Sequence, residues 1–207
     1  MQQLFSNSPV RKLRKGQILI YEGDAVQNIF WLINGYVKVF NILPNGTQRT
    51  MIIYAPDDAF PLTSFLSGAG VARYFYECMT DVELNAMPQT TFQEKIKGNL
   101  EMGEKLIAYT YALNRQFIDR IETLSAHSAR HKVAALLAYL ISKTGADSND
   151  TSVRLSIPLT TQDIADMCSL ARETASVQLT KLKRDGTISG TRHLIINKAK
   201  LKKALPD

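Results

Sequence analysis

The sequence of 207 residues predicts an α+β fold: an N-terminal antiparallel β domain, a long amphipathic helix and a compact C-terminal helical domain. Three observations support this prediction. Short apolar runs separated by Gly, Pro, Asn and Asp fill roughly residues 1–90, as in an all-β sandwich or barrel. The apolar spacing then changes to a helical period. The excess positive charge is confined to the part after residue 124.

The β domain is predicted from four apolar runs and their turns. The runs are QILIY (17–21), IFWLI (29–33), YVKVF (36–40) and TQRTMIIY (47–54), and VELNAMP (82–88) forms a further strand. Asn34-Gly35 and Asn45-Gly46 predict hairpins, because tight primed turns need residues that tolerate positive φ.

A single long helix is expected at about residues 95–124. Seven apolar residues recur there at helical spacing: Leu106, Ile107, Leu113, Phe117, Ile118, Ile121 and Leu124. About 25 residues span ~37 Å, which is more than a small barrel needs for cover. The helix therefore serves as a dimer seam or as a cap on the barrel, and we favour the seam.

Charge divides the chain into two modules, residues 1–124 and 125–207. The first holds twelve Lys and Arg against twelve Asp and Glu, and the second holds thirteen against seven. A basic second module indicates a polyanionic partner, with a solvated basic surface as the alternative.

Several classes of protein are disfavoured by composition. Two cysteines, Cys78 and Cys168, are too few for a disulfide scaffold or an all-cysteine metal site, and they indicate a reducing, cytoplasmic setting. No apolar run reaches 18 residues, so no membrane span is expected. The N-terminal residues lack the pattern of a signal peptide.

Residues 160–186 predict two helices separated by a short turn. Thr160 and Asp163 form a capping-box-like start. Inward-facing positions are Ile164, Ala165 and Met167 in the first helix and Ala175, Leu179 and Leu182 in the second. A small hairpin around Gly190 and a basic tail helix follow, which completes a winged helix–turn–helix.

The second helix, about residues 171–185, carries the side chains expected to read DNA in the major groove. Arg172 can donate two hydrogen bonds to guanine, and Glu173 can accept one from cytosine. Ser176 can bond either a donor or an acceptor on a base. The remaining candidate DNA-binding residues are Thr161, Val177, Thr180, Lys181, Lys183 and Arg192. The alternative is a polar surface helix without a ligand.

These residues carry a family resemblance. LTTQDIADMCSLARETASVQLTKLKRDGTIS resembles the winged helix of the Crp/Fnr superfamily of bacterial transcription regulators, with Arg172-Glu173-Thr174-Ala175-Ser176 as the recognition motif. KGQILIYEGD (15–24) and IFWLINGYVKVF (29–40) resemble the family's β-roll, a double-stranded β-helix of jelly-roll type. The resemblance implies a homodimer on an inverted-repeat operator, contact with RNA polymerase, and no enzymatic activity.

The chain departs from the family pattern in its helix–turn–helix, at residues 169, 171 and 177. Val177 stands where relatives often have arginine, and apolar contact with a thymine methyl group is its natural replacement. Ser169 stands at the usual turn glycine. Ala171 replaces the usual Ser or Thr cap, and the missing cap lowers the stability of the helix by about 0.5–2 kcal/mol.

The β-roll lacks the groups that hold a cyclic nucleotide in relatives. Pro61-Leu62 stands near the family's Gly-Glu pair, and bulky Tyr74 follows Arg73. Cyclic AMP is therefore not expected to be the effector, which stays unidentified, and no cofactor is expected. Phe65 and Tyr74–Tyr76 make the pocket apolar or fill it. Its candidate lining residues are Leu62, Thr63, Arg73, Tyr74, Thr110 and Asn114.

Two other function classes fit the sequence less well. A cupin-like enzyme needs inward histidines on a metal, and residues 1–124 contain none. A signalling module without DNA binding leaves residues 160–196 unexplained. Cys78 fits a strand core better than a redox sensor, and His127 and His131 fit polar contacts better than a metal site.

Overall fold

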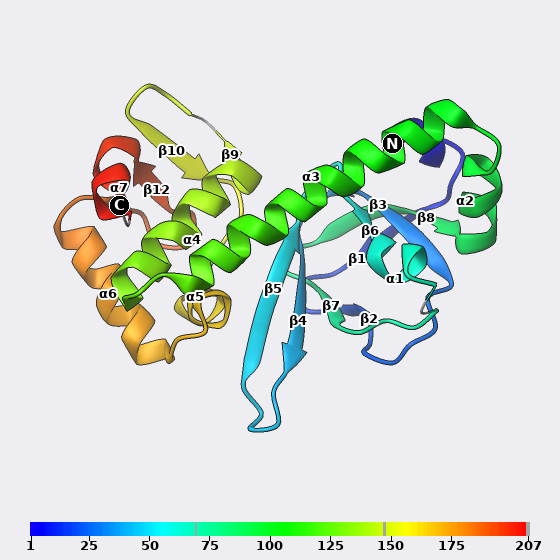
Figure 1. Ribbon diagram of the computed structural model, residues 1–207. Coiled ribbons are helices and arrows are strands. Elements are labelled where there is room, and N and C mark those ends of the chain that lie inside the picture. The colour runs from blue at the N-terminus through cyan, green and yellow to red at the C-terminus, as the bar shows by residue number, and fades with distance from the viewer. Residues whose placement is uncertain (69, 147, 206–207) are drawn as a thin grey trace. The chain divides into compact units, whose positions relative to one another are not determined.

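The chain forms two compact units in the computed structural model, which describes residues 1–68, 70–146 and 148–205. The first unit holds residues 1–45 and 51–116, and the second holds residues 46–50 and 117–207. The division falls inside the long helix α3 (Leu100–Ser125), so its two ends belong to different units. Figure 1 labels the elements.

Two four-stranded sheets make up most of the first unit. The first sheet has the order β1-β8-β3-β6, and the second has the order β2-β7-β4-β5. The bounds of the first sheet's strands are β1 Val10–Leu13, β8 Val82–Pro88, β3 Asn28–Asn34 and β6 Ala59–Phe60. Those of the second are β2 Ile18–Ile20, β7 Phe75–Cys78, β4 Val37–Ile42 and β5 Gln48–Tyr54. The predicted α+β class is confirmed.

The two Asn-Gly turns have different roles. Asn45-Gly46 joins the neighbouring strands β4 and β5, so that hairpin is confirmed. The hairpin predicted at Asn34-Gly35 is wrong, because β3 and β4 lie in different sheets. Gly35 has a φ of +90°, and a Cβ there would collide with the carbonyl oxygen of Asp81. A close backbone approach therefore requires this glycine where the chain changes sheets.

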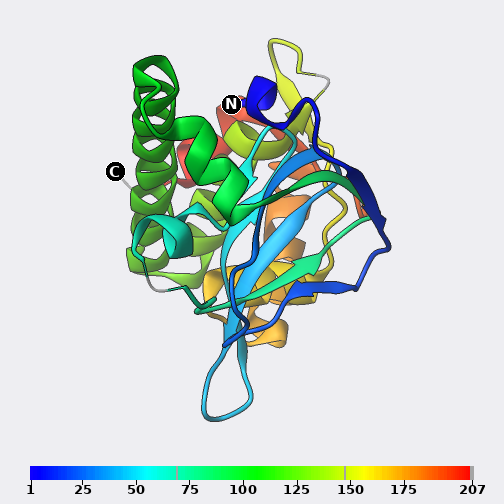
Figure 2. The same ribbon diagram turned by 90° about the vertical axis from the view of Figure 1, so that its right-hand side faces the viewer.

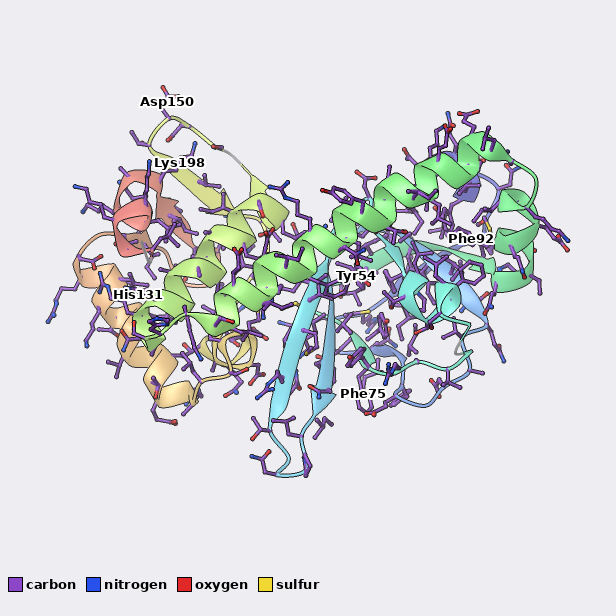
Figure 3. All side chains as sticks on the ribbon, in the orientation of Figure 1. Tyr54, Phe75, Phe92, His131, Asp150 and Lys198 are labelled. Atoms are coloured by element: carbon purple, nitrogen blue, oxygen red, sulfur yellow. The ribbon has the colours of Figure 1, made fainter. Side chains whose placement is uncertain are left out.

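An apolar cluster forms the core at one end of the roll. It joins residues of the 3₁₀ helix η1 (Gln2–Phe5), the short helix α1 (Leu62–Leu66), α2 (Gln89–Ile96), α3 and the first sheet. Its largest members are Phe5, Trp31 and Phe92, the last of which is labelled in Figure 3. The ring centroids of Phe5 and Trp31 are 5.8 Å apart.

The long helix expected at about residues 95–124 is confirmed as α3, which begins at Leu100 and ends at Ser125. The first residues of the expected range belong to a separate helix, α2. Gly98, with a φ of +73°, lies between the two helices in a conformation that other residues rarely adopt. The side-chain oxygen of Asn99 then accepts from the amide of Met102 at 3.1 Å, at the start of α3. The apolar periodicity alone did not reveal this break.

The second unit contains four further helices and a small sheet. The helices are α4 (Ala129–Thr144), α5 (Thr161–Cys168), α6 (Arg172–Arg184) and α7 (Lys198–Ala204). The sheet has the order β11-β12-β10-β9, with bounds Ile188–Ser189, Ile195–Asn197, Ser152–Leu155 and Gly145–Ala146. Helix α4 buries Val133, Leu136, Leu137 and Leu140 and contacts α5, α6 and α7. Figure 2 turns the same elements by 90°.

The predicted inner faces of α5 and α6 are confirmed. All six residues assigned to them are buried: Ile164, Ala165, Met167, Ala175, Leu179 and Leu182. In the described part of the chain, no helix is long and apolar enough to cross a membrane.

Candidate nucleic-acid interface and interior of the β-roll

The first helix of the pair begins with the predicted capping box. The Thr160 hydroxyl accepts from the amide of Asp163 at 3.1 Å, and the Asp163 carboxylate accepts from the amide of Thr160 at 2.8 Å. These bonds satisfy amides that a helix start leaves unpaired. The start of α5, which includes Thr161, is thereby fixed.

The turn between the two helices carries two unfavourable features. Ser169 has a φ of +53°, the left-handed conformation that glycine adopts more readily. Ala171 is the N-cap of α6 and provides no side-chain hydrogen bond. The loss of the cap expected from the sequence is confirmed.

Helix α6 presents a continuous polar face to solvent. The exposed residues on it include Arg172, Glu173, Ser176, Val177, Thr180, Lys181 and Lys183. Thr180 donates its hydroxyl to the carbonyl of Ser176 at 2.9 Å, which leaves its oxygen able to accept. The helix thus brings seven of the nine candidate DNA-binding residues onto one exposed surface.

A small groove of about 120 Å³ joins α6 to the start of α5 and to the wing. Four candidate residues line it: Thr161 from α5, and Ser176, Thr180 and Lys183 from α6. Thr160, the N-cap of α5, and Thr191 of the wing are its other polar lining residues. Hydroxyl groups, one ammonium group and the positive end of α5 together suit an anionic oxygen. No pattern in the sequence points to Thr191.

The wing consists of β11, β12 and the connection between them. Ile188 pairs with Ile196 and Ser189 with Ile195. Arg192 is exposed in this connection, and its carbonyl accepts from the amide of Leu159 at 2.9 Å. The backbone of the wing is therefore tied to the segment that precedes α5.

The C-terminal end of α6 is held by charges. Arg130 of α4 donates to the Asp185 carboxylate at 2.7 Å, and Lys200 of α7 donates to the Asp185 carbonyl at 2.7 Å. The Thr187 hydroxyl and then Arg130 lower the pKa of Asp185. These contacts fix where the recognition helix ends. No local pattern in the sequence predicts these contacts, because the partners lie far apart in the chain.

A buried arginine of α3 supports the other helix of the pair. Arg120 donates to the carbonyl of Met167 in the last turn of α5 at 2.7 Å. Its guanidinium carbon lies 5.4 Å from the centroid of the Tyr139 ring, and burial lowers its pKa. Leu106, Leu113 and Arg120 are seven residues apart and all buried, a spacing that was visible in the sequence.

Aromatic side chains fill the interior of the β-roll. Phe60 of one sheet lies against Tyr54 and Tyr76 of the other, with centroid distances of 4.9 and 5.7 Å and interplanar angles of 16° and 15°. All three are buried. Phe75 stacks on Phe40 at 5.2 Å. Tyr54 and Phe75 are labelled in Figure 3. The stacked rings of Tyr54, Phe60 and Tyr76 therefore occupy space between the two sheets.

The six candidate effector residues lie in different environments. Leu62 is buried in the apolar core, whereas Thr63, Arg73 and Asn114 are exposed. Tyr74 is half-buried, and Thr110 is half-buried and donates to the carbonyl of Leu106. The core position of Leu62 separates it from the exposed members of the set.

Tyr109, which the sequence analysis did not single out, connects α3 to the strand β6. Its hydroxyl accepts from the amide of Ala59 at 2.7 Å and lies 3.4 Å from the Asp58 carboxylate. Asp58 also accepts from the amide of Ala55 at 2.7 Å. The Asp58 carboxylate is thus engaged within the protein.

Both thiols are buried and unreactive. Burial raises the pKa of Cys78 to about 11 and that of Cys168 to about 12, which disfavours the reactive thiolate. Within residues 1–68, 70–146 and 148–205, no three His, Cys, Asp or Glu side chains are grouped to hold a metal ion. His131, labelled in Figure 3, donates its amide to the cap residue Ser128.

Comparisons with known proteins agree with this arrangement. A cyclic nucleotide-binding domain matches residues 10–99, and a Crp-like helix-turn-helix domain matches residues 131–204. The chain is 26% identical to the transcriptional activator protein FnrL of Cereibacter sphaeroides, covering 90% of this chain and 75% of that protein. It is 28% identical to a probable transcriptional activator of Rhizobium leguminosarum bv. viciae, over 95% and 80% of the two chains.

A solved structure shares the same fold. FixK2 from Bradyrhizobium japonicum superposes with a TM-score of 0.84 at 21% identity, covering 97% of this chain and 98% of that one. The two domain matches, their order along the chain and the exposed helix α6 lead to one conclusion. The chain is a DNA-binding transcription regulator of the Crp/Fnr type.

Proposed function

We propose that this regulator acts as a homodimer joined along α3, which places two α6 helices in the major grooves of an inverted-repeat operator. The exposed apolar face of α3 carries the proposal. Ile107, Tyr111, Ile118 and Ile121 are 72, 71, 56 and 63% exposed. Large apolar side chains at such exposure on one helix face mark an interaction surface.

The arrangement of faces on α3 favours a second copy of this chain as the partner. Residues 106, 113 and 120 are buried against the protein's own body. Residues 107, 111, 114, 118 and 121 follow in steps of four and three on a separate, exposed face. This spacing is that of a two-stranded coiled-coil seam, in which a helix packs against its own symmetry copy.

Base recognition is assigned to the N-terminal half of α6. Arg172 donates to guanine, Glu173 accepts from cytosine, and Val177 contacts a thymine methyl group. Exposure of all three side chains supports this assignment. Ser176 lies on the same face within reach of either base type.

Phosphate contacts are assigned to the groove and its surroundings. Thr161, Thr180 and Lys183 line the groove, where a backbone phosphate receives hydrogen bonds and charge. Lys181 and Arg192 are exposed beside this surface and supply further charge. These contacts set the register of the protein on DNA without reading sequence.

We infer that cyclic AMP is not the effector. The stacked rings of Tyr54, Phe60 and Tyr76 occupy the interior of the roll, and Asp58 is already engaged by Ala55 and Tyr109. A buried ribose hydroxyl without a partner costs about 1–3 kcal/mol. The regulator needs no bound cofactor in this proposal, and its effector is a different signal or none.

The cellular setting follows from the same proposal. A regulator that binds the chromosome works in the cytoplasm of a bacterium, which agrees with the two buried, unpaired thiols. Relatives described as transcriptional activators support contact with RNA polymerase.

Selection from a randomised DNA library with the full-length protein tests the proposal. We expect an inverted repeat whose half-site centres are about 34 Å apart, and much weaker binding to a single half-site. A matched pair of variants locates the seam: Ile118→Glu is expected to give a monomer with half-site affinity, and Ala112→Glu, at an exposed position off the seam, a dimer. A monomeric wild-type protein that binds one half-site with full affinity contradicts the proposal.

A further inference from the structure

One polar residue interrupts the apolar seam of α3. Asn114 lies at its centre, with Ile107 and Tyr111 before it and Ile118 and Ile121 after it. Its side chain is exposed in the single chain, so water satisfies the amide there. Formation of the proposed dimer removes this water.

Once buried in the dimer, the Asn114 amide needs hydrogen-bond partners. A buried amide that loses its hydrogen-bond partners is destabilising, whereas a paired amide is tolerated. The side chain carries both a donor and an acceptor. It is therefore complementary to a second copy of itself, in which the oxygen of one amide accepts from the nitrogen of the other.

Few arrangements of two α3 helices bring the two amides together. In a parallel pair without stagger, each seam residue faces its own copy, so Asn114 faces Asn114 of the partner. A shift by seven residues places Asn114 opposite Ile107 or Ile121. An antiparallel pair also places it opposite an apolar side chain unless the helices cross at that residue. The shifted pair and any antiparallel pair that crosses elsewhere bury the amide in an apolar environment, and the position of the cross-link at residue 125 distinguishes parallel from antiparallel helices.

We propose that Asn114 forms a hydrogen-bonded pair with its own copy across the dimer axis and thereby selects the parallel, unstaggered dimer. The proposal rests on the α3 dimer proposed above and adds the residue that sets its register. Register determines the separation and orientation of the two α6 helices, and therefore the operator spacing that the dimer accepts. The exposed position of Asn114 on the outer face of α3 favours this role over lining an effector pocket.

Cross-linking of the full-length chain tests the register. Ser125 and Ile118 lie on the seam seven residues apart, so Ser125→Cys reports the unstaggered pair when it links to itself. A mixture of Ser125→Cys and Ile118→Cys chains reports the shifted pair when residue 118 links to residue 125, as identified by mass spectrometry. With Asn114 present, we expect only the first link.

Asn114→Leu is the decisive variant. Because a polar seam residue sets register at a cost in stability, we expect the shifted link to appear and the dimer dissociation constant to fall at least tenfold. Ala112→Leu adds the same side chain to an exposed position off the seam and is expected to change neither. If Asn114→Leu still yields only the unstaggered link, Asn114 does not set the register and the proposal is overturned.

The dimer itself is tested separately. If Ile118→Glu is monomeric by sedimentation but Asn114→Leu keeps the register, the α3 seam stands and only the role of Asn114 fails. If Ile118→Glu remains as dimeric as the wild-type chain, the seam is not the interface and both proposals fail. Helical content by circular dichroism verifies that each variant is folded.

Discussion

The guanidinium of Arg120 in α3 donates to the main-chain carbonyl of Met167 in α5 at 2.7 Å, with only 3% of the arginine exposed. This bond connects α3 to the C-terminal end of α5, the first helix of the helix–turn–helix. It anchors the segment that positions α6. Removal of the arginine leaves a buried carbonyl without this donor.

Arg120→Ala is therefore expected to lower the free energy of unfolding by about 2–4 kcal/mol, from the lost hydrogen bond and the lost packing of the long side chain. Urea unfolding followed by circular dichroism measures this. Arg115→Ala, at an exposed position of the same helix, is expected to stay within about 0.5 kcal/mol of the wild type. Equal effects of the two variants contradict the anchoring role.

Glu173 is expected to recognise a base, whereas Lys183 is expected to contact the phosphate backbone. Glu173→Ala is expected to relax the preference at one base pair of each half-site by about 1–3 kcal/mol. Lys183→Ala is expected to weaken all sequences alike and to reduce the slope of affinity against salt by about one unit. Fluorescence anisotropy on a set of single-base operator variants separates the two patterns. Uniform loss with Glu173→Ala shows that this residue reads no base.

The uncapped start of α6 offers a stabilising change. Ala171→Ser supplies a hydroxyl to a free amide and is expected to raise the free energy of unfolding by about 1 kcal/mol. Ala171→Val adds bulk without an oxygen and is the control, with no gain expected. Thermal unfolding of both variants beside the wild type measures the difference.

The Arg130–Asp185 pair is expected to be sensitive to acid. Because the pKa of Asp185 is lowered in the folded protein, its contribution is complete above the unfolded value of about 3.9 and is lost as the pH falls through the folded value. Both side chains are 38% exposed, so the contribution is about 0.2–1 kcal/mol. Asp185→Asn is expected to be less stable than the wild type at pH 7, and this difference in the free energy of unfolding is expected to shrink below about pH 4. A difference that stays constant down to pH 3 excludes the carboxylate as its source.

Calorimetry tests the effector. Titration of the full-length protein with cyclic AMP and with cyclic GMP is expected to give no binding heat at physiological nucleotide concentrations, while operator binding proceeds without ligand. The reason is the filled interior of the roll and the engaged Asp58 carboxylate. Micromolar binding of either nucleotide, coupled to tighter operator binding, contradicts the inference.

Local patterns in the sequence predicted much of the helix–turn–helix and part of the β-roll. The capping box of Thr160 and Asp163, the missing cap at Ala171 and the buried faces of α5 and α6 all depend on residues within one or two helical turns. The Asn45-Gly46 hairpin depends on two adjacent residues in the same way. Such features follow from backbone preferences and periodicity, which a single segment contains in full.

Tertiary structure alone decided which distant segments meet. The chain changes sheets at Gly35 because the backbone of Asp81 approaches it, and neither local composition nor spacing contains that approach. The same holds for Tyr109 at Ala59 and for Arg130 at Asp185, whose partners are 50 and 55 residues away in sequence. The stacking of Phe60 on Tyr54 and Tyr76 could not be predicted from the sequence for the same reason. Ring stacking depends on how two sheets face each other, and packing of that kind is a property of the folded chain as a whole.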